Sequence, residues 1–513
     1  MEYRKTTIVL TSIATGLVCM LVFVRALSFD FLNYDDMDFV LYNPNIRNLD
    51  MDMLSYAFTT VPPFSGIWTP LVWASFAVDY HFWGLNPLGY HLTNILIHAV
   101  NASLVVLIAD KLFMAKSEFS ETFLTISSRR YYPAVLLAAG LLFGIHPLRV
   151  ESVVWISERK DVLNGIFALG SILFYLLYVE SNASLLKKSM ARRCYFISLL
   201  LLLFSFMAKP ISVVIPVILL VLDWYPLNRL GRATMRSILI EKIPYFVLSM
   251  AMTSLTLYIA SSENGMLVST SLLSFGQRLV ISGNAIFEYI RFIVYPVTIL
   301  PTHLLATPIP FSYTLKTTVI FVVFIYFAIT RKPSWLFAAW LCFIIPLLPV
   351  LAFFQTNSVA FAARYTYLPS VIPSIAVIAI ISAVYEKSTI WRYNRYIREF
   401  LTSILIAVLL FHGLLTTRLI GVWKNSETFW TRQITYQPYD KAYFLRAGFY
   451  LYDGNYAAAI QDYTVCIEIA LQENLDPVTV KNLYAYRGDA FSKAGRYLEA
   501  VRDFSTVINF SPD

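Results

Sequence analysis

The stretch TIVLTSIATGLVCMLVFVRAL, Thr7–Leu27, decides the fold class of this chain. It contains one charged residue and is long enough to cross a bilayer, for which a helix needs about 20 apolar residues. A basic start precedes it and no small-residue cleavage site follows it, so we interpret it as a retained first span and not as a removed signal. Directly after it comes FLNYDDMDFV, Phe31–Val40, which places three aspartates at the expected membrane surface.

The rest of the chain has the same apolar character. Of its 513 residues, 58% are hydrophobic and only 14% are charged, whereas a soluble domain has about 25% charged residues. The net charge is +8, but the basic residues gather in short runs between apolar segments. Such runs set membrane orientation and give no support to nucleic-acid binding. The four cysteines are far apart and indicate no disulfide framework or metal site. We therefore expect an all-α polytopic protein, integral to a membrane and in contact with its lipids.

About eleven segments qualify as spans when short or bent ones are included. They are Thr7–Leu27, His91–Leu112, Tyr132–Ile145, Val162–Val179, Cys194–Met207, Ile211–Leu222, Pro244–Ala260, Thr317–Thr330, Pro333–Phe354, Leu368–Val384 and Phe400–Ile420. An inside N-terminus puts every basic cluster between them, such as Lys187–Arg193, Arg229–Lys242 and Arg331/Lys332, on the cytoplasmic side. The C-terminus then lies outside.

This alternation requires that Gln277–Val297 does not cross the membrane. Charged and amide side chains interrupt that segment, which suits an interfacial amphipathic helix better than a lipid-facing span. Two alternatives remain open. Either this segment crosses and another does not, or Cys194–Met207 and Ile211–Leu222 form a re-entrant hairpin.

The expected topology gathers most of the chemically interesting residues on the outer face. The first outer loop, residues 28–90, is too long for a plain connector and contains Asp35 and Asp36. Adjacent carboxylates can be a helix cap or a solvated loop. They can also form a general base, with the pKa of one carboxyl raised by its neighbour and by partial burial.

Three further outer segments could belong to the same site. The second loop, HPLRVESVVWISERKD (His146–Asp161), mixes acids and bases beside apolar spans. Such a mixture forms either a salt-bridged surface turn or the lining of a cavity. Arg364 offers a planar fork suited to phosphate oxygens, and Lys209 could serve the same anion as a point charge. Each of these two cations could equally well extend toward lipid headgroups.

The chain after Ile420 has a soluble, helical character and repeats itself. In AGFYLYDGNYAAAIQDYTVCIEIA and GDAFSKAGRYLEAVRDFSTVINFSP, Gly454 aligns with Gly495 and Tyr456 with Tyr497. Small and aromatic residues at these positions are typical of tetratricopeptide repeats. We expect a membrane domain over 1–422 and a repeat domain over 423–513, with repeats at about 440–471 and 481–513. Two repeats fall short of the about three that make a stable stack, so we expect them to pack on another surface.

The motifs YDD, HPLRVESVVWISERKD, MAKPISVVIPVILLVLDWYPL and ARYTYLPS, together with the terminal repeats, resemble a known family. They are similar to bacterial relatives of the transmembrane-and-tetratricopeptide-repeat O-mannosyltransferases, within the GT-C superfamily. The resemblance implies a glycosyltransferase that uses a polyprenyl-phosphate-linked sugar. It also implies a location in the bacterial inner membrane, with the active site and the repeats on the extracytoplasmic side.

The resemblance also assigns roles to residues of this chain. It implies that Asp35 is the general base and that Asp36 is the second acidic residue of the motif. It places Arg364, Arg159 and Lys209 at the donor phosphate, and His146, Glu151 and Asp161 among the polar positions of the second loop. No metal site and no cofactor are assigned, and metal dependence is left open because the resemblance covers enzymes of both kinds.

One position departs from the family pattern. The relatives carry an acidic residue immediately before the arginine of RYTYLP, where this chain has Ala363. Either a nearby carboxylate substitutes for it, or Arg364 is held differently, or this member is weakened in catalysis.

Two functions follow as expectations. The first is transfer of a sugar, with inversion, from a polyprenyl-phosphate donor to an extracytoplasmic acceptor, a protein Ser or Thr hydroxyl that the repeats help to bind. The alternative is a non-catalytic membrane scaffold whose repeats recruit cell-envelope or secretion proteins. A transporter is disfavoured, because the charged residues lie at span ends and not at mid-membrane.

Overall fold

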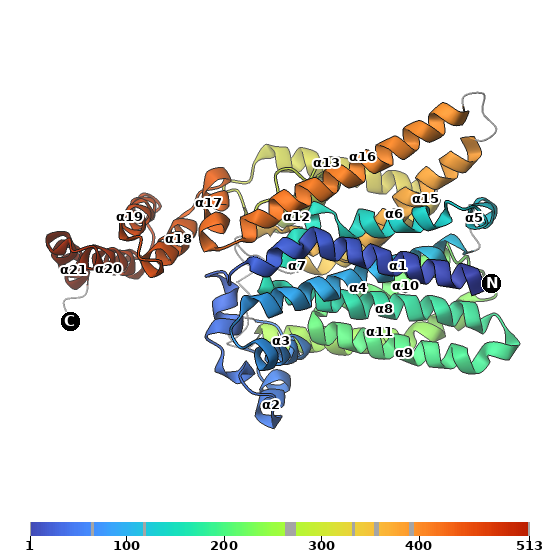
Figure 1. The fold of residues 1–513 in the computed structure, drawn as a ribbon, viewed down its shortest axis with the longest axis horizontal. Coiled ribbons are helices and arrows are strands. Elements are labelled where there is room, and N and C mark those ends of the chain that lie inside the picture. Colours follow the sequence, from blue (N-terminus) through green and yellow to red (C-terminus); the bar gives the residue numbers. More distant parts are fainter. Residues whose placement is uncertain are drawn as a thin grey trace.

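The structure is a computed structural model that describes residues 2–62, 66–115, 120–261, 273–330, 334–352, 359–388 and 394–510. Almost all of the described chain is helical (Figure 1). Within these ranges the strands are β1 (His303–Leu304) and β2 (Val359–Phe361), which form one short antiparallel pair. The all-α fold class predicted from the sequence is confirmed.

Each of the eleven expected spans overlaps a helix. In chain order these helices are α1 (Glu2–Phe23), α4 (Pro87–Phe113), α6 (Tyr132–Gly144), α8 (Arg159–Asn182), α9 (Lys188–Ala208), α10 (Ile215–Trp224), α11 (Met235–Ser261), α13 (Phe311–Thr330), α14 (Ser334–Ile344), α15 (Val371–Lys387) and α16 (Asn394–Ile420). Among the described residues, seven helices, those containing α1, α4, α8, α9, α11, α13 and α16, are long and apolar enough to cross a membrane alone. The protein is therefore a polytopic membrane protein.

The remaining expected spans are bent or short. Helix α6 and the segment Pro147–Val154 are long and apolar enough to cross a membrane only when taken together, with a bend of 51° between them. Pro210–Trp224 and Ser334–Val350 are shorter apolar helices. Helix α12 (Phe275–Val294), which covers most of the segment expected not to cross, is not among the seven. The basic pair Arg331/Lys332 lies outside the described residues.

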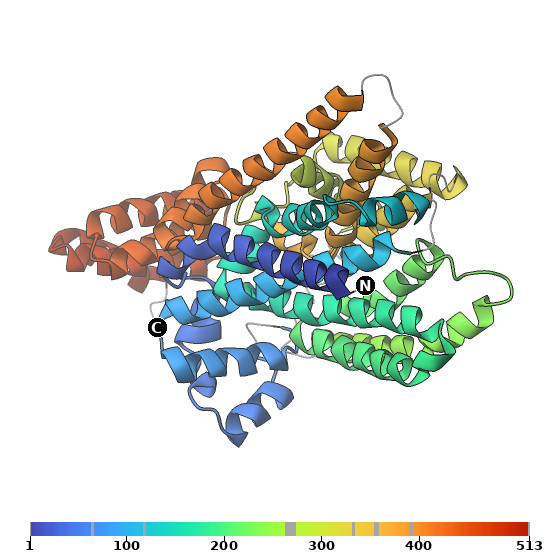
Figure 2. The same ribbon diagram turned by 45° about the vertical axis from the view of Figure 1, so that its right-hand side comes forward.

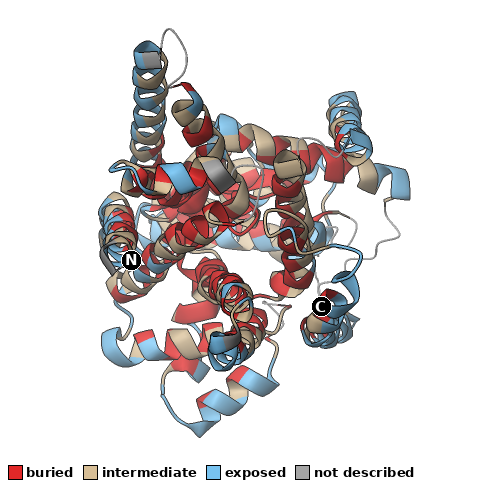
Figure 3. Ribbon diagram, turned by 90° about the vertical axis from the view of Figure 1, so that its right-hand side faces the viewer, coloured by how far each residue is buried: buried red, intermediate tan, exposed pale blue. Residues whose placement is uncertain are grey.

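Figure 3 shows buried residues at the centre of the bundle and exposed residues toward its outside. Leu21 of α1, Val247 of α11, Val322 of α13 and Leu414 of α16 are more than half exposed. Apolar side chains turned outward from a helix that can span a bilayer are in contact with lipid tails, which are as apolar as the side chains. These four helices therefore lie at the lipid-facing surface.

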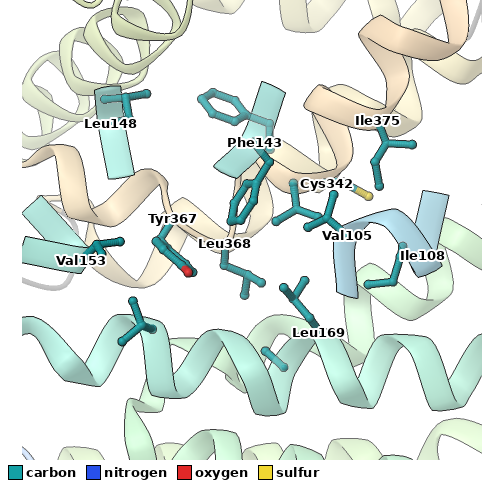
Figure 4. Packing of buried hydrophobic residues seen from close by; sticks show 14 of the residues in the cluster. Val105, Ile108, Phe143, Leu148, Val153, Leu169, Cys342, Tyr367, Leu368 and Ile375 are labelled. Atoms are coloured by element: carbon teal, nitrogen blue, oxygen red, sulfur yellow. The ribbon is translucent and has the colours of Figure 1, made fainter. Parts of the chain in front are cut away.

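Buried polar groups fix the helices against one another. The imidazole of His98 on α4 contacts the Tyr367 hydroxyl and the Gly144 carbonyl oxygen, each at 2.8 Å. The amide of Asn101, one turn further along α4, donates to the same hydroxyl at 2.8 Å. Figure 4 shows Tyr367 among the apolar side chains of the core, with Phe143 and Leu368 nearby. Buried hydrogen bonds between helices favour one arrangement of the helices over others.

The long first loop forms short helices at one end of the bundle. They are η2 (Met37–Leu41), η3 (Pro44–Ile46), α2 (Met51–Thr59) and α3 (Pro70–Trp83), and η1 (Val24–Ser28) leads into them from α1. The second loop lies at the same end and forms η4 (Pro147–Arg149), α7 (Val150–Val154) and η5 (Ile156–Glu158). We call this end of the bundle the loop end.

The C-terminal helices project from the loop end (Figures 1 and 2). They are α17 (Ser426–Tyr436), α18 (Asp440–Tyr452), α19 (Tyr456–Gln472), α20 (Pro477–Lys493) and α21 (Tyr497–Phe510). The turns α18–α19 and α20–α21 carry Gly454 and Gly495 at φ +80° and +74°, a conformation that strongly favours glycine. The ion pairs Arg446–Asp462 and Arg487–Asp503 occupy matching places in the two helix pairs. The domain boundary after residue 422 stays a prediction.

Candidate active site

Asp36 joins the first loop to the second. One of its carboxylate oxygens accepts the Ser157 N–H at 2.9 Å and also the Ser157 hydroxyl, and the other accepts the Leu32 N–H at 3.0 Å. Burial raises the pKa of Asp36 to about 6, although these donors act in the opposite direction. Both oxygens are committed to holding the chain, so the geometry favours a structural role for this carboxylate over a role as a base.

Asp35 is held differently. Its side chain is half-buried and makes no hydrogen bond or ion pair within the described part of the chain. Burial raises its pKa, and the nearby charge of Lys160 acts against that rise. A carboxylate that has a raised pKa and no partner can take a proton from a bound hydroxyl, because its oxygens are free to approach the substrate.

Tyr34 fixes the backbone next to Asp35. Its ring stacks on Trp155 of the second loop, with the ring centroids 5.3 Å apart, and meets Trp430 of α17 edge-on at 5.5 Å. An offset or edge-to-face aromatic pair contributes about 1 kcal/mol beyond the area that it buries. Tyr34 therefore holds the chain on the N-terminal side of Asp35, while Asp36 holds it on the other side.

Glu158 is the centre of a cluster of cations beside Asp35. Its carboxylate accepts a hydrogen bond from Lys209 Nζ at 2.7 Å and forms ion pairs with Lys160 Nζ at 3.2 Å and Arg364 Nε at 3.8 Å. Lys209 also bonds Asp161 at 2.5 Å. Residues that lie from 2 to more than 200 positions apart in the sequence thus meet in one ion network. Five charged groups placed so closely at the ends of apolar helices form a polar site in otherwise apolar surroundings.

Arg364 is bound by Glu151. One Glu151 oxygen accepts the Arg364 guanidinium, and the other accepts the Arg364 backbone N–H at 2.9 Å. The guanidinium also lies over the rings of Tyr365 and Trp155, at 4.9 and 5.7 Å from their centroids. The residue before Arg364 is Ala363, and the Arg364 side chain is paired instead with a carboxylate from the second loop.

Hydrogen bonds to neighbouring elements anchor the segment that carries Arg364. The buried guanidinium of Arg149 donates to the Thr366 carbonyl oxygen at 3.3 Å and to the Thr366 hydroxyl at 3.1 Å. Tyr367 follows and is bonded to α4 as described above. Because these anchors lie two and three residues after Arg364, they fix the position from which its side chain reaches Glu151.

Two of the predicted site residues lie apart from the cluster. Arg159 is fully buried and pairs with Asp79, and it donates to Asn94 Oδ1 and the Tyr90 carbonyl oxygen at 2.7 Å each. His146 caps its own turn by accepting the Leu148 N–H at 3.2 Å. The geometry gives both residues a structural role and leaves the Arg159 guanidinium without a free edge for a phosphate.

Sequence reasoning missed three residues that the structure brings to the cluster. Glu158 and Lys160 lie in the second loop next to predicted site residues. Their spacing in the sequence does not indicate which side chains of this loop face Asp35. Lys441 belongs to α18, in the segment interpreted only as a repeat, and its charge acts on Asp35. Within the described ranges, no three His, Cys, Asp or Glu side chains gather closely enough to hold a metal ion.

Parts of the chain are similar to known proteins. Protein O-mannosyl-transferase Tmtc1 of Drosophila melanogaster is 34% identical over 110 residues, which are 21% of this chain and 11% of that protein. Protein O-mannosyl-transferase tmtc2 of Xenopus laevis is 34% identical over 113 residues, 22% of this chain and 12% of that protein. Protein O-mannosyl-transferase TMTC4 of Homo sapiens is 29% identical over 180 residues, 33% of this chain and 23% of that protein.

The chain thus spans less than a quarter of the length of these curated relatives. The predicted resemblance to this group of O-mannosyltransferases is confirmed over a fifth to a third of the chain, while the bacterial origin stays a prediction. No family model matches the chain, and no solved structure matches it.

Proposed function

We propose that this protein is a membrane glycosyltransferase that transfers a sugar from a polyprenyl-phosphate donor to a protein Ser or Thr hydroxyl. The observation that carries the proposal is the meeting of an unpartnered carboxylate, Asp35, with the cations around Glu158 at the loop end. The partial relatives are named protein O-mannosyl-transferases, which supports this reaction class and favours mannose as the sugar.

The reaction is a single displacement at the anomeric carbon. Asp35 takes the proton of the acceptor hydroxyl as the oxygen forms its bond to the sugar. The bond between the anomeric carbon and the phosphate oxygen breaks, and its electron pair leaves with the polyprenyl phosphate. Because the new bond forms on the face opposite to the one that breaks, the configuration of the sugar is inverted.

Arg364 is the group that we assign to the leaving phosphate. A guanidinium matches two phosphate oxygens in one plane, and the Arg364 side chain is 17% exposed, so that one edge is open to a ligand. Lys160 and Lys209 add positive charge beside it. Charges fixed before the reaction stabilise the phosphate without a cost of reorganisation at the moment of bond breaking.

The topology fits a donor that reaches the site from the lipid. With the basic clusters on the cytoplasmic side, the loop end faces the extracytoplasmic side, where polyprenyl-linked sugars and secreted acceptors meet. In the bacterial case the membrane is the inner membrane. The helices α18–α21 stand at the same end and would contact the acceptor protein.

Exchange of one carboxylate tests the proposal. The purified chain in lipid nanodiscs would be incubated with polyprenyl-phosphate mannose and a Ser/Thr-rich peptide, and glycopeptide would be counted by mass spectrometry. We expect Asp35→Asn to lower the rate by about 100-fold or more, the usual contribution of a general base.

The matched control is Asp38→Asn, which makes the same change three residues away at an exposed side chain. Its rate is expected to stay within about twofold of the unmodified protein, since a surface substitution of this kind perturbs little. Full activity of Asp35→Asn, with donor consumed and peptide modified, would overturn the mechanism.

A further inference from the structure

The first loop is tied to the C-terminal helices through Asn33, two residues before Asp35. The Asn33 N–H donates to the Ser426 hydroxyl at 2.8 Å, and its amide oxygen accepts the Trp430 indole N–H at 2.8 Å. The Asn33 amide nitrogen donates to the Leu445 carbonyl oxygen of α18 at 2.5 Å. The backbone next to Asp35 is therefore held jointly by α17 and α18.

Helix α17 also reaches the Arg364 side of the site. The side-chain oxygens of Gln433 and Gln437 accept the backbone N–H groups of Thr302 and Leu304 at 3.0 and 3.1 Å. Strand β1, which contains Leu304, pairs with β2, and β2 ends three residues before Arg364. Helix α17 thus contacts the segments that carry both halves of the candidate site.

Lys441, at the start of α18, is a charged side chain of the C-terminal helices that lies against this loop. Its Nζ lies 5.7 Å from the centroid of the Tyr34 ring. Lys441 is exposed, and it makes no ion pair within the described part of the chain. An ammonium with no counter-ion, fixed over the residue next to an unpartnered carboxylate, stabilises the ionised form of that carboxylate.

We propose that Lys441 is a positioning residue of the site, supplied by the repeat segment, which keeps Asp35 ionised and ready to accept a proton. The proposal rests on the proposed function for its catalytic meaning. It gives the C-terminal helices a part in the chemistry, in addition to any contact with an acceptor protein.

The other charged groups that act on Asp35 come from several elements. They are Glu158 at the end of η5, Lys160 at the start of α8, Arg364 in η10 (Ala363–Thr366), and Asp36 beside Asp35 in the chain. Lys160 and Arg364 are both shared with Glu158. Lys441 is not shared in this way, so its removal changes the charge around Asp35 without leaving another carboxylate unpaired.

The alternative is that Lys441 is solvated and does not act on Asp35. Many exposed lysines have no measurable effect on their neighbours. The two interpretations differ in what Lys441→Met does to Asp35. If Lys441 acts on the carboxyl, its loss raises the pKa of Asp35, because a nearby positive charge favours the ionised form of a carboxyl.

The test measures the protonation of Asp35 without any sugar substrate. The full chain in nanodiscs would be treated with a water-soluble carbodiimide and an amine, which label protonated carboxyl groups, over a series of pH values. Tandem mass spectrometry of the peptide that contains Asp35 gives the pH at half-maximal labelling. Lys441→Met is expected to raise this midpoint, and Lys441→Arg is expected to retain it.

Lys493→Met is the matched control. Lys493 is an exposed lysine of the same segment, on α20, where it pairs with Asp489. Its removal should leave the labelling midpoint of Asp35 unchanged. An unchanged midpoint in Lys441→Met, or an equal rise in Lys493→Met, would overturn the inference.

Transfer assays separate this inference from the proposed function. If both hold, the acidic limb of the pH–rate profile of Lys441→Met moves to higher pH by the same amount as the labelling midpoint. If Asp35→Asn transfers normally while the midpoint still shifts, the proposed function fails and the electrostatic link stands. If Asp35→Asn is inactive and the midpoint does not shift, the role of Lys441 fails alone.

Discussion

At the scale of single residues, Asp35 and Asp36 show how two adjacent carboxylates come to differ. Asp36 points into the protein, where Ser157 and Leu32 use both of its oxygens, whereas Asp35 keeps its oxygens free at the edge of the cation cluster. The motif alone could not assign these roles. Which aspartate points inward depends on the Ser157 backbone, 121 positions further along the chain.

The buried carboxyl of Asp36 predicts a pH dependence of stability. Its folded pKa of about 6 lies above the ordinary value of about 4, so between these values the folded protein holds a proton that the unfolded chain releases. The stability that this group contributes is fully present below pH 4 and is lost as the pH rises through 6. The loss amounts to about 3 kcal/mol.

Thermal unfolding of the protein and of Asp36→Asn at pH 4, 5, 6 and 7 measures this effect. The amide at position 36 does not titrate, so the stability of the unmodified protein relative to the variant should fall steadily with rising pH. A difference that stays constant, or that grows with pH, would show that Asp36 is not held in the environment described here.

At the scale of elements, the sequence predicted the helices better than their contacts. Apolar runs of sufficient length located every main helix of the bundle, because a helix satisfies its own backbone groups in lipid. The pairing of Arg364 with Glu151 joins residues 213 positions apart and depends on how α7 and η10 meet. Local sequence patterns do not predict that these two residues meet in space.

Arg159 shows that a local pattern also leaves open which way a side chain points. Its place in a charged string suggested a role at the phosphate, but the helical turn directs its guanidinium toward Asp79 and Asn94 in the buried interior. In a helix, adjacent residues point in directions about 100° apart, so Lys160 faces the cluster while Arg159 faces away. Helical periodicity predicts that Lys160 and Arg159 point in different directions, but it predicts which of them faces the cluster only when the inner face of α8 is known.

Because α8 packs closely against α4 at Gly165, adding one methyl group there should destabilise the protein. A Cβ at Gly165 would lie 2.8 Å from Asn101 Nδ2 and 2.8 Å from Tyr367 Cε1. Both groups belong to the network that anchors the Arg364 segment. Gly165→Ala should therefore cost about 1–3 kcal/mol of stability, as overpacking of a core does, and should also lower the transfer rate by moving Tyr367.

Gly413→Ala is the control, because a Cβ there would meet only Ile145 Cδ1 at an ordinary 3.8 Å. In the middle of helix α16 that substitution should be neutral or stabilising by up to about 1 kcal/mol. Thermal unfolding of both variants in one detergent makes the comparison. Equal melting temperatures for the two would contradict the packing described for α8.

At the scale of the whole molecule, the bundle brings together at one end groups that come from most of its length. The first loop supplies Asp35, the second loop supplies Glu151 and Glu158, and the segment after β2 supplies Arg364. The C-terminal helices close the same end through Asn33 and Lys441. We expect such a polar cluster at the end of an apolar bundle to suit a substrate with a charged head and an apolar tail.

For the proposed transfer to occur, Asp35 and Arg364 must flank one bound sugar phosphate. The most direct measurement is a cryo-electron microscopy structure of Asp35→Asn in nanodiscs, incubated with polyprenyl-phosphate mannose so that the donor accumulates intact. We predict density for the phosphate against the Arg364 guanidinium, with the sugar lying between it and position 35. Phosphate density at the opposite end of the bundle, beside Arg229 and Lys242, would contradict the account.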